Sequence, residues 1–273
     1  MTRIVHLSDF HYGTEIAAVE AALKAELSLA ACDLIVVSGD ITQRARRSQF
    51  RRAQALLSGF SAPKLIVPGN HDMPLYDLPR RFTGSLSRYH RYINDAPYPC
   101  YSDDSVIVLG VNTGRPFLWK NGTVDERQIA DIRKRLASQP QERIRILVTH
   151  HPLFARSARG LRLHAWAWRL LEGLGTYRPH VVLSGHLHVS HVLEVPAVNP
   201  ERAGRILDIQ AGTALSNRRR GEPNAYNCLD LDSTGISVEV RSFDGRGFAH
   251  QKRLDYQRIN DGWRLKIPQG STE

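Results

Sequence analysis

The chain runs repeatedly from a short, mainly apolar segment straight into a cluster of aspartate, asparagine and histidine residues. Five such junctions occur within the first 190 residues, and each apolar segment has the length of a strand rather than a helix. In open α/β sheets, ligands bind beyond the carboxyl ends of the strands. The pattern therefore predicts that the five polar clusters converge on one crevice.

Helical segments separate the strands in the first part of the chain. Strands are expected at residues 4–7, 34–37, 65–67, 106–111, 144–148 and 181–183. Amphipathic or basic helices are expected at residues 16–27, 45–58, 126–136 and 163–174. After residue 189 the pattern changes to short strands with little helix between them, at residues 189–195, 206–210, 227–231 and 236–240. This order predicts an α/β fold in which two mixed sheets pack together with helices outside.

The whole chain, residues 1–273, is expected to form a single domain with a β-rich C-terminal part from about residue 189. Residues 73–103 interrupt the regular pattern with four prolines and many aromatic and arginine residues, which indicates a cap or an insertion. The last thirty residues are polar and basic, and we expect them to wrap the surface or to fray.

Composition excludes several classes of protein. No apolar run approaches the roughly 20 residues that cross a bilayer, and the N-terminus lacks the features of a signal peptide, so a cytoplasmic location is expected. Three scattered cysteines do not make a disulfide framework or a cysteine-based zinc site. The net charge is +10, and lysine supplies only six of the 37 basic residues. This arginine excess reflects either genome composition or a surface that attracts anionic partners.

The polar clusters contain the ligand types of a metal site. Asp9 and His11 follow the first strand, and Asp40, whose carboxylate could bridge two cations, follows the second. Asn70 offers an amide oxygen, and three imidazoles come later in the chain, from His150, His186 and His188. Oxygen and nitrogen ligands without thiolate suit manganese, iron or zinc better than calcium. Two ions roughly 3.5–4 Å apart would stabilise both oxygens of a phosphoryl displacement and acidify a shared water into a hydroxide nucleophile.

Together these motifs resemble the signature blocks of the calcineurin-like metallophosphoesterase superfamily. The matching blocks are Asp9-Phe10-His11, Gly39-Asp40, Gly69-Asn70-His71-Asp72, His150 and Gly185-His186-Leu187-His188. The resemblance implies a four-layer α/β/β/α sandwich and a centre of two divalent or mixed-valence metal ions. It implies that one ion is held by Asp9, His11, Asp40 and His188. The other would be held by Asp40, Asn70, His150 and His186.

The same resemblance assigns catalytic roles beside the metal ligands. His71 matches the position that donates a hydrogen bond to the scissile phosphate or protonates the leaving oxygen, which suits a group whose pKa lies near neutrality. Asp72 is expected to orient His71. In motifs of this type the first of two adjacent histidines is the ligand, so His150 is chosen and His151 is left to face the substrate.

The substrate is predicted less directly. The His150-His151-Pro152 block and the segment from Gly212 to Asn224 most resemble the bacterial class III cyclic-nucleotide phosphodiesterases and their broad phosphodiesterase relatives. A small phosphodiester is therefore the expected substrate. The expected substrate contacts are His151, Asn112, Arg220 and Asn224.

Other functions stay open at this point. A UDP-2,3-diacylglucosamine-type pyrophosphatase shares the motifs and acts at a membrane surface, and the basic, aromatic residues 73–103 would suit an anionic bilayer. A nuclease would use the same ligands, but 273 residues leave little room for DNA-binding segments, so nucleic acid is not expected as a partner. A non-catalytic scaffold of the retromer type lacks part of the ligand set, which this chain keeps. A homo-oligomer is compatible with the sequence.

Overall fold

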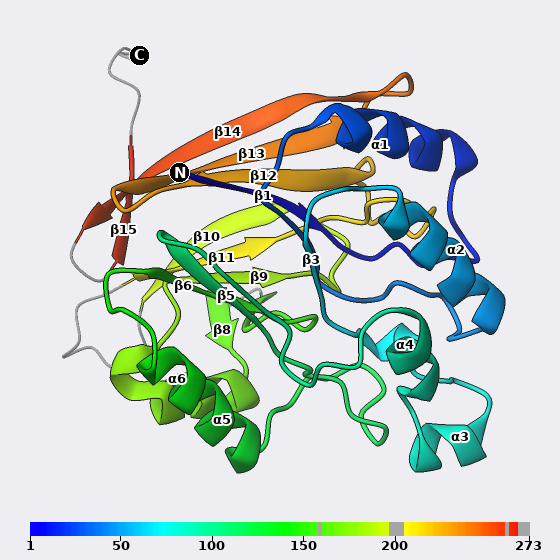
Figure 1. Cartoon of the computed structure of the whole chain (residues 1–273), viewed down its shortest axis with the longest axis horizontal. Helices are drawn as coiled ribbons and strands as arrows, with labels where there is room; N and C mark the ends of the chain where they lie inside the picture. Colours follow the sequence, from blue (N-terminus) through cyan, green and yellow to red (C-terminus); the bar gives the residue numbers. More distant parts are fainter. Residues whose placement is uncertain (158–159, 197–204, 260–261, 267–273) are drawn as a thin grey trace.

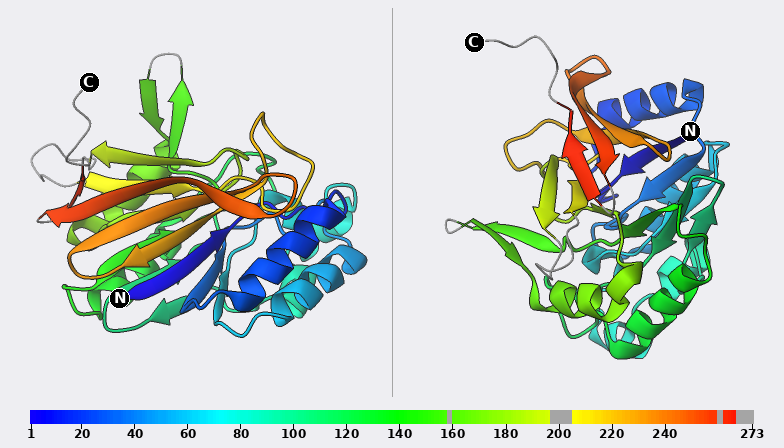
Figure 2. Two further views of the ribbon diagram at one scale, coloured as in Figure 1. Left: turned by 90° about the horizontal axis from the view of Figure 1, so that it is seen from above. Right: turned by 90° about the vertical axis from the view of Figure 1, so that its left-hand side faces the viewer.

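The computed structural model describes residues 1–157, 160–196, 205–259 and 262–266. In this part of the chain, two β-sheets pack face to face and helices cover the outer surface of each (Figure 1). The α/β fold of two mixed sheets flanked by helices is thus confirmed. The turned views in Figure 2 show the same layers from above and from the side.

Among the described residues, the first sheet has seven strands in the order β15-β14-β13-β12-β1-β2-β3. Its three parallel strands are β1 (Thr2–Leu7), β2 (Leu34–Val37) and β3 (Lys64–Ile66). Its antiparallel part consists of β12 (Ala225–Leu231), β13 (Gly235–Phe243), β14 (Phe248–Ile259) and β15 (Gly262–Leu265).

The second sheet has the order β10-β11-β9-β6-β5-β4 within the described ranges. Its strands are β4 (Cys100–Ser102), β5 (Val106–Gly110), β6 (Ile144–Val148), β9 (Val181–Ser184), β10 (His191–Pro196) and β11 (Arg205–Gln210). A separate hairpin, β7 (Phe154–Ser157) with β8 (Gly160–Leu163), stands apart from both sheets and was not predicted from the sequence.

The helices lie on the two outer faces. The first sheet is covered by α1 (Ala17–Leu29) and α2 (Arg47–Ser58), and the second by α5 (Glu126–Ala137) and α6 (Ala165–Leu174) (Figure 1). Two shorter helices, α3 (Leu78–Thr83) and α4 (Ser87–Tyr92), lie beyond α2. The remaining turns are the 3₁₀ helices η1 (Asn70–Asp72) and η2 (Gly175–Tyr177). None of the described helices has the length and apolarity of a membrane span.

The strands are apolar at nearly every position because both faces of each sheet are buried. In β2, Leu34 and Val36 pack between the sheets, whereas Ile35 and Val37 pack under α1 and α2. Successive side chains point to opposite faces of a strand, so a strand between two apolar layers has no polar face. This explains the continuous apolar runs that preceded each polar cluster in the sequence.

The expectation for the last thirty residues was wrong over most of their length. Residues 248–259 form the long strand β14, which pairs with β13. Antiparallel pairing uses backbone groups, so the outward side chains of β14 can be polar while Phe248 and Tyr256 are buried. Residues 267–273 lie outside the described part of the chain.

Residues 73–103 carry α3, α4 and the edge strand β4 rather than one continuous cap. The buried Tyr89 of α4 donates from its hydroxyl to the carbonyl of Ile66, at 2.8 Å. Part of this segment therefore packs directly on the end of β3, close to where the predicted Asn70 motif begins.

Candidate metal centre

The loops that follow the parallel strands of both sheets meet at one end of the sandwich. The amide of His11 donates to the carbonyl of Asp40 (2.9 Å), which joins the loops after β1 and β2. The amide of His186 donates to Asp9 Oδ2 (2.9 Å), which joins the second sheet to the first. The five polar clusters therefore do converge, and the centre lies between the two sheets.

One group of donor atoms comes from Asp9, His11, Asp40 and His188, which are all buried. The Nε2 atoms of His11 and His188 lie 3.2 Å apart, and each lies within 3.4 Å of Asp9 Oδ1. His11 Nε2 is also 3.5 Å from Asp40 Oδ2. Donors bound at about 2.1 Å in a tetrahedral arrangement lie about 3.4 Å apart, so this spacing fits a single metal ion.

A second group surrounds Nε2 of His150. That atom lies 3.1 Å from Asn70 Oδ1, 3.2 Å from His186 Nδ1 and 3.4 Å from Asp40 Oδ1. Asp40 thus presents Oδ2 to the first group and Oδ1 to the second. A carboxylate placed in this way is suited to bridge two cations, and the structure brings the residues of the predicted second set together.

Backbone carbonyls fix which nitrogen of two histidines faces the centre. His150 Nδ1 donates to the carbonyl of Ser38 (2.9 Å), and His188 Nδ1 donates to the carbonyl of Arg218. Each bond turns the other ring nitrogen, Nε2, toward the donor group, which is the orientation of a metal-binding histidine. Asp9 Oδ1 is buried and has no hydrogen-bond partner. A cation bound at this point would supply the missing interaction.

The backbone of the centre is held in an uncommon conformation. Among the described residues, six that are not glycine have positive φ, and five of these are predicted ligands: Asp9, His11, Asp40, His186 and His188. Left-handed backbone costs of order 1–3 kcal/mol for such residues and clusters at functional sites. Glycines allow the close approach, because a Cβ atom at Gly69 would collide with the carboxylate of Asp40.

Charge is concentrated in the same place. Burial raises the pKa of Asp9, but the imidazoles of His11 and His188 beside its Oδ1 more than offset this and hold the pKa well below its usual range. Burial lowers the pKa of His150, but the charge of Asp40 outweighs it and raises the pKa to about 9. Two ionised carboxylates are thus buried together, and metal cations would supply the positive charge that balances them.

His71 lies beside the first donor group, and its ring is held differently from the sequence expectation. Nδ1 donates to the carbonyl of Gln43 (3.0 Å), whereas the carboxylate of Asp72 accepts from the amides of Thr42 (2.8 Å) and Gly69 (2.9 Å). The expected contact between Asp72 and the ring is replaced by the Gln43 carbonyl, because the η1 turn directs the two side chains apart. Asp72 instead ties the loops after β2 and β3 together.

The second of the adjacent histidines, His151, is also buried. Its Nδ1 is 2.8 Å from the hydroxyl of Thr113, and its Nε2 has no hydrogen-bond partner. The His151 and His186 rings lie 4.7 Å apart between centroids. The donor atoms of His150, His151 and His186 lie within 4.8 Å of one another, so His151 borders the second group.

The loop after β11 supplies a residue that sequence reasoning missed, Arg218. Its Nη1 atom is 3.1 Å from His71 Nε2, 3.3 Å from His11 Nδ1 and 3.2 Å from Gln43 Oε1. The predicted Arg220 is exposed instead. The signal in the sequence was the run Arg218-Arg219-Arg220, but nothing in the run distinguishes which guanidinium turns inward.

The two predicted asparagines are placed as turn residues. Asn224 is buried, and its amide donates to the carbonyls of Ser216 (2.8 Å) and Thr213 (3.3 Å). Asn112 accepts from the amide of Gly114 (2.8 Å) and lines a cavity of about 240 Å³ with Pro68. Within the described chain, no hydrogen bond joins either side chain to the metal-ligand set.

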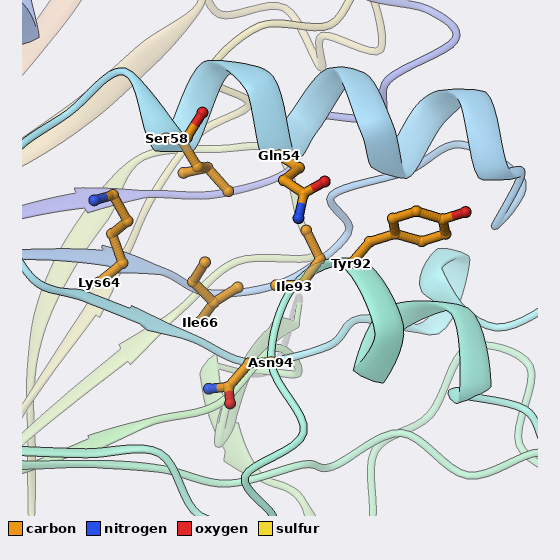
Figure 3. A pocket seen from close by; sticks show the side chains of 8 residues that line it. Gln54, Ser58, Lys64, Ile66, Tyr92, Ile93 and Asn94 are labelled. Carbon is orange, nitrogen blue, oxygen red and sulfur yellow. The ribbon is translucent and has the colours of Figure 1, made fainter.

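A cavity of about 380 Å³ lies away from this centre, beside β3 and α2 (Figure 3). Its walls include Gln54, Lys64 and Asn94, and none of the predicted site residues lines it. The candidate centre is therefore defined by convergent ligands and not by the size of a cavity.

This arrangement of donors suits metal-dependent phosphoester chemistry, and the comparison with known families agrees. The model of the calcineurin-like phosphoesterase family matches residues 2–190, so the chain belongs to this family. It is 29% identical over 160 residues to the 3',5'-cyclic adenosine monophosphate phosphodiesterase CpdA of Escherichia coli, in strains K12 and O157:H7. The match covers 57% of this chain and 54% of the relative, so the chain spans about half the length of the curated relatives it matches.

Solved structures show the same fold at low sequence identity. The purple acid phosphatase PPD1 from yellow lupin seeds superposes with a TM-score of 0.69 at 14% identity, over 91% of this chain and 52% of that one. Vps29 of Chaetomium thermophilum superposes with a TM-score of 0.50 at 10% identity, over 94% and 98% of the two chains. At such identities the likeness is one of fold.

Proposed function

We propose that this chain is a phosphodiesterase that uses two metal ions to hydrolyse a small phosphodiester, with cyclic nucleotides as the first class to test. The observation that carries the proposal is Asp40, whose two carboxylate oxygens face two separate donor groups. The similarity to a cyclic AMP phosphodiesterase supports the choice of substrate class. Manganese, iron and zinc fit the oxygen and nitrogen donors.

When bound, the two ions would polarise the phosphoryl oxygens and lower the pKa of a water so that it can attack phosphorus. The chain's own contribution is to fix the ligands before substrate arrives. Ser38 and Arg218 orient His150 and His188 through their carbonyls, and the left-handed backbone at Asp40 aims its carboxylate between the two groups. Little reorganisation is then needed during the reaction.

His71 is the proposed proton donor to the leaving oxygen. Because Nδ1 donates to the Gln43 carbonyl, Nε2 is the nitrogen that exchanges a proton with the substrate. Burial lowers the pKa of His71, and the positive charge of Arg218 lowers it further, although Asp40 opposes both. A lowered pKa makes the imidazolium a stronger acid, which helps it to protonate an alkoxide.

Arg218 is the proposed contact to the phosphate. Metal binding at His11 Nε2 would place the ring proton on Nδ1, which can then no longer accept from the guanidinium. While His71 carries its acidic proton on Nε2, that atom cannot accept from Arg218 either, so the guanidinium would keep Gln43 as its acceptor and have donors free for a phosphate oxygen. Guanidinium groups bind phosphate with strong, directional hydrogen bonds.

The test is hydrolysis of bis-p-nitrophenyl phosphate against p-nitrophenyl phosphate by chelated protein re-metallated with manganese. We expect faster turnover of the diester, and turnover of cyclic AMP as the next substrate. A preference for the monoester would identify a phosphatase and contradict the proposal.

A second variant separates an enzyme from a scaffold. His71→Ala removes the proposed acid but none of the ligands, so it should bind as much metal as the wild type and lose most of its turnover. The loss should be greater for a diester with a poor leaving group, because that oxygen depends most on protonation. Equal loss for good and poor leaving groups would exclude His71 as the acid.

A further inference from the structure

An exposed patch of large apolar side chains lies on the segment after η1 and on the loop after β5. We call it the aromatic patch, and it consists of Tyr76, Leu78, Phe82, Phe117 and Trp119. These are half of the large hydrophobic residues that the described chain exposes. Tyr76 is 77% exposed and Phe117 is 76% exposed, so both rings project into solvent. Large groups of exposed apolar side chains are uncommon on protein surfaces and mark interaction sites.

The aromatic patch is a built surface and not a chance grouping. The rings of Phe82 and Phe117 lie 5.2 Å apart between centroids. The fully buried Arg81 joins the two segments, because it donates to the carbonyls of Pro116 (2.7 Å) and Pro74 (2.9 Å). Its guanidinium also lies 4.1 Å from the ring centroid of Trp119. Arg81 therefore connects the segment after η1 to the loop after β5, and so fixes the two parts of the patch relative to each other.

The segments that carry the patch are mainly basic, although Arg80 and Arg115 are paired with Asp77 and Asp125. Residues 74–92 and 115–120 carry five further basic side chains besides Arg81: Arg80, Arg88, Arg91, Arg115 and Lys120. The same segments contain a single acidic residue, Asp77, which pairs with Arg80. A second copy of the chain would bring like charges together if it docked on this face, which argues against self-association.

We propose that the aromatic patch binds the surface of a bilayer that contains anionic lipids. Tryptophan, tyrosine and phenylalanine side chains partition into the interface between headgroups and acyl chains. Each nearby basic side chain adds attraction to anionic headgroups. The patch combines both features on a protruding face, and α3 lies at the lower right edge of the molecule in Figure 1.

The patch borders the metal centre. Tyr76 lies five residues after His71, and the guanidinium of Arg44 lies 5.5 Å from the centroid of its ring. The neighbouring Gln43 contacts both His71 and Arg218. A bilayer bound at the patch would therefore lie close to His71 and Arg218. Membrane binding itself needs neither metal nor turnover, so it is independent of the proposed function.

The experiment is cosedimentation of the chelated protein with vesicles of phosphatidylglycerol and phosphatidylcholine in equal parts. Vesicles of phosphatidylcholine alone serve as the uncharged comparison. We expect binding to the anionic vesicles, and weaker binding at high salt because the electrostatic part is screened. Vesicles with brominated acyl chains should quench tryptophan fluorescence, and Trp119→Phe should remove most of that quenching.

The variant Tyr76→Ser/Phe117→Ser tests the patch itself. It should weaken vesicle binding about tenfold or more, because two rings no longer enter the interface. The matched control is Leu29→Ser/Trp168→Ser, which changes residues that are 89% and 45% exposed on α1 and α6. The control should bind as the wild type does, and the metal-loaded forms of both variants should hydrolyse a soluble diester equally.

Three results would overturn the proposal. The first is a wild-type protein that stays in the supernatant with anionic vesicles at low salt. The second is an equal loss of binding in the patch variant and the control. The third is light scattering that shows a wild-type dimer which the patch variant converts to a monomer, because the patch would then join two copies of the chain.

Discussion

The metal centre and the aromatic patch lie side by side but are stabilised in opposite ways. The predicted ligands of the centre are nearly all buried, come from the loops of both sheets and include five residues with left-handed backbone. The patch exposes its side chains on two adjacent segments and depends on one buried side chain, Arg81. The comparison teaches that the chemistry requires convergence of distant segments, whereas a binding surface requires only exposure and a rigid support.

The largest effect that we expect from a single substitution is at Asp40. Asp40→Ala removes a donor from both groups at once, and should lower diester turnover about a thousandfold. It should also lower the amount of bound manganese per chain, measured by elemental analysis. The Tyr76→Ser/Phe117→Ser variant should change neither quantity. An Asp40→Ala protein that kept full metal content would contradict the bridging role.

The centre could be predicted from sequence because each ligand lies at the end of a recognisable strand. Asp9, Asp40 and His186 follow apolar runs that are buried on both faces, and parallel pairing brings their ends together. The α/β fold of two mixed sheets was predicted from the same apolar runs. Strands without such runs were missed or misjudged, as the polar strand β14 and the hairpin of β7 and β8 show.

Other features depend on tertiary contacts that have no local pattern. Three consecutive arginines look alike in sequence, but the carbonyl of Arg218 is held by His188, and this contact turns its side chain toward His71. The carbonyl that orients His71 belongs to Gln43, and a backbone group leaves no trace in residue identity. The aromatic patch also has no local pattern in the sequence, because some of its residues lie within residues 73–103 and the others lie in a loop beyond that range.

We expect the next largest effect from a substitution of Arg218. Comparing it with a substitution of Arg220 separates the role of the inward guanidinium from that of an exposed one. Arg218→Met keeps the carbonyl that orients His188 but removes the charge beside His71. The KM for the diester should rise about tenfold to a hundredfold, as expected for loss of a hydrogen bond to a charged group. Arg220→Met, at an exposed position, should leave KM within about twofold. Equal effects of the two substitutions would show that only overall charge matters.

Arg81 tests the support of the patch. Arg81→Met removes two hydrogen bonds to backbone carbonyls and the contact with Trp119, and should lower the free energy of unfolding by about 2 kcal/mol. Phe117→Ser, which removes an exposed ring, should change it by less than about 0.5 kcal/mol. Urea unfolding measures both. If Phe117→Ser destabilised the protein as much as Arg81→Met, the ring would belong to the core and the patch would not be a free surface.

The last prediction concerns Asp208, a carboxyl group buried on β11 one strand from the His186 loop. Burial raises its pKa to about 7, and Gln210 donates to Oδ2 at 3.2 Å. Between about pH 4 and pH 7 the unfolded chain releases this proton while the folded chain keeps it, so stability falls as pH rises through that window. Asp208→Asn replaces the carboxyl group with an amide, which does not titrate in this pH range.

The Asp208→Asn protein should therefore unfold at a Tm a few degrees above the wild type at pH 8, and the difference should vanish near pH 4. The exposed Asp104→Asn should show no such dependence. Thermal unfolding of chelated protein across this range measures the effect. A constant difference at every pH would mean that the amide alters packing, whereas the expected slope would show that burial keeps the Asp208 carboxyl neutral.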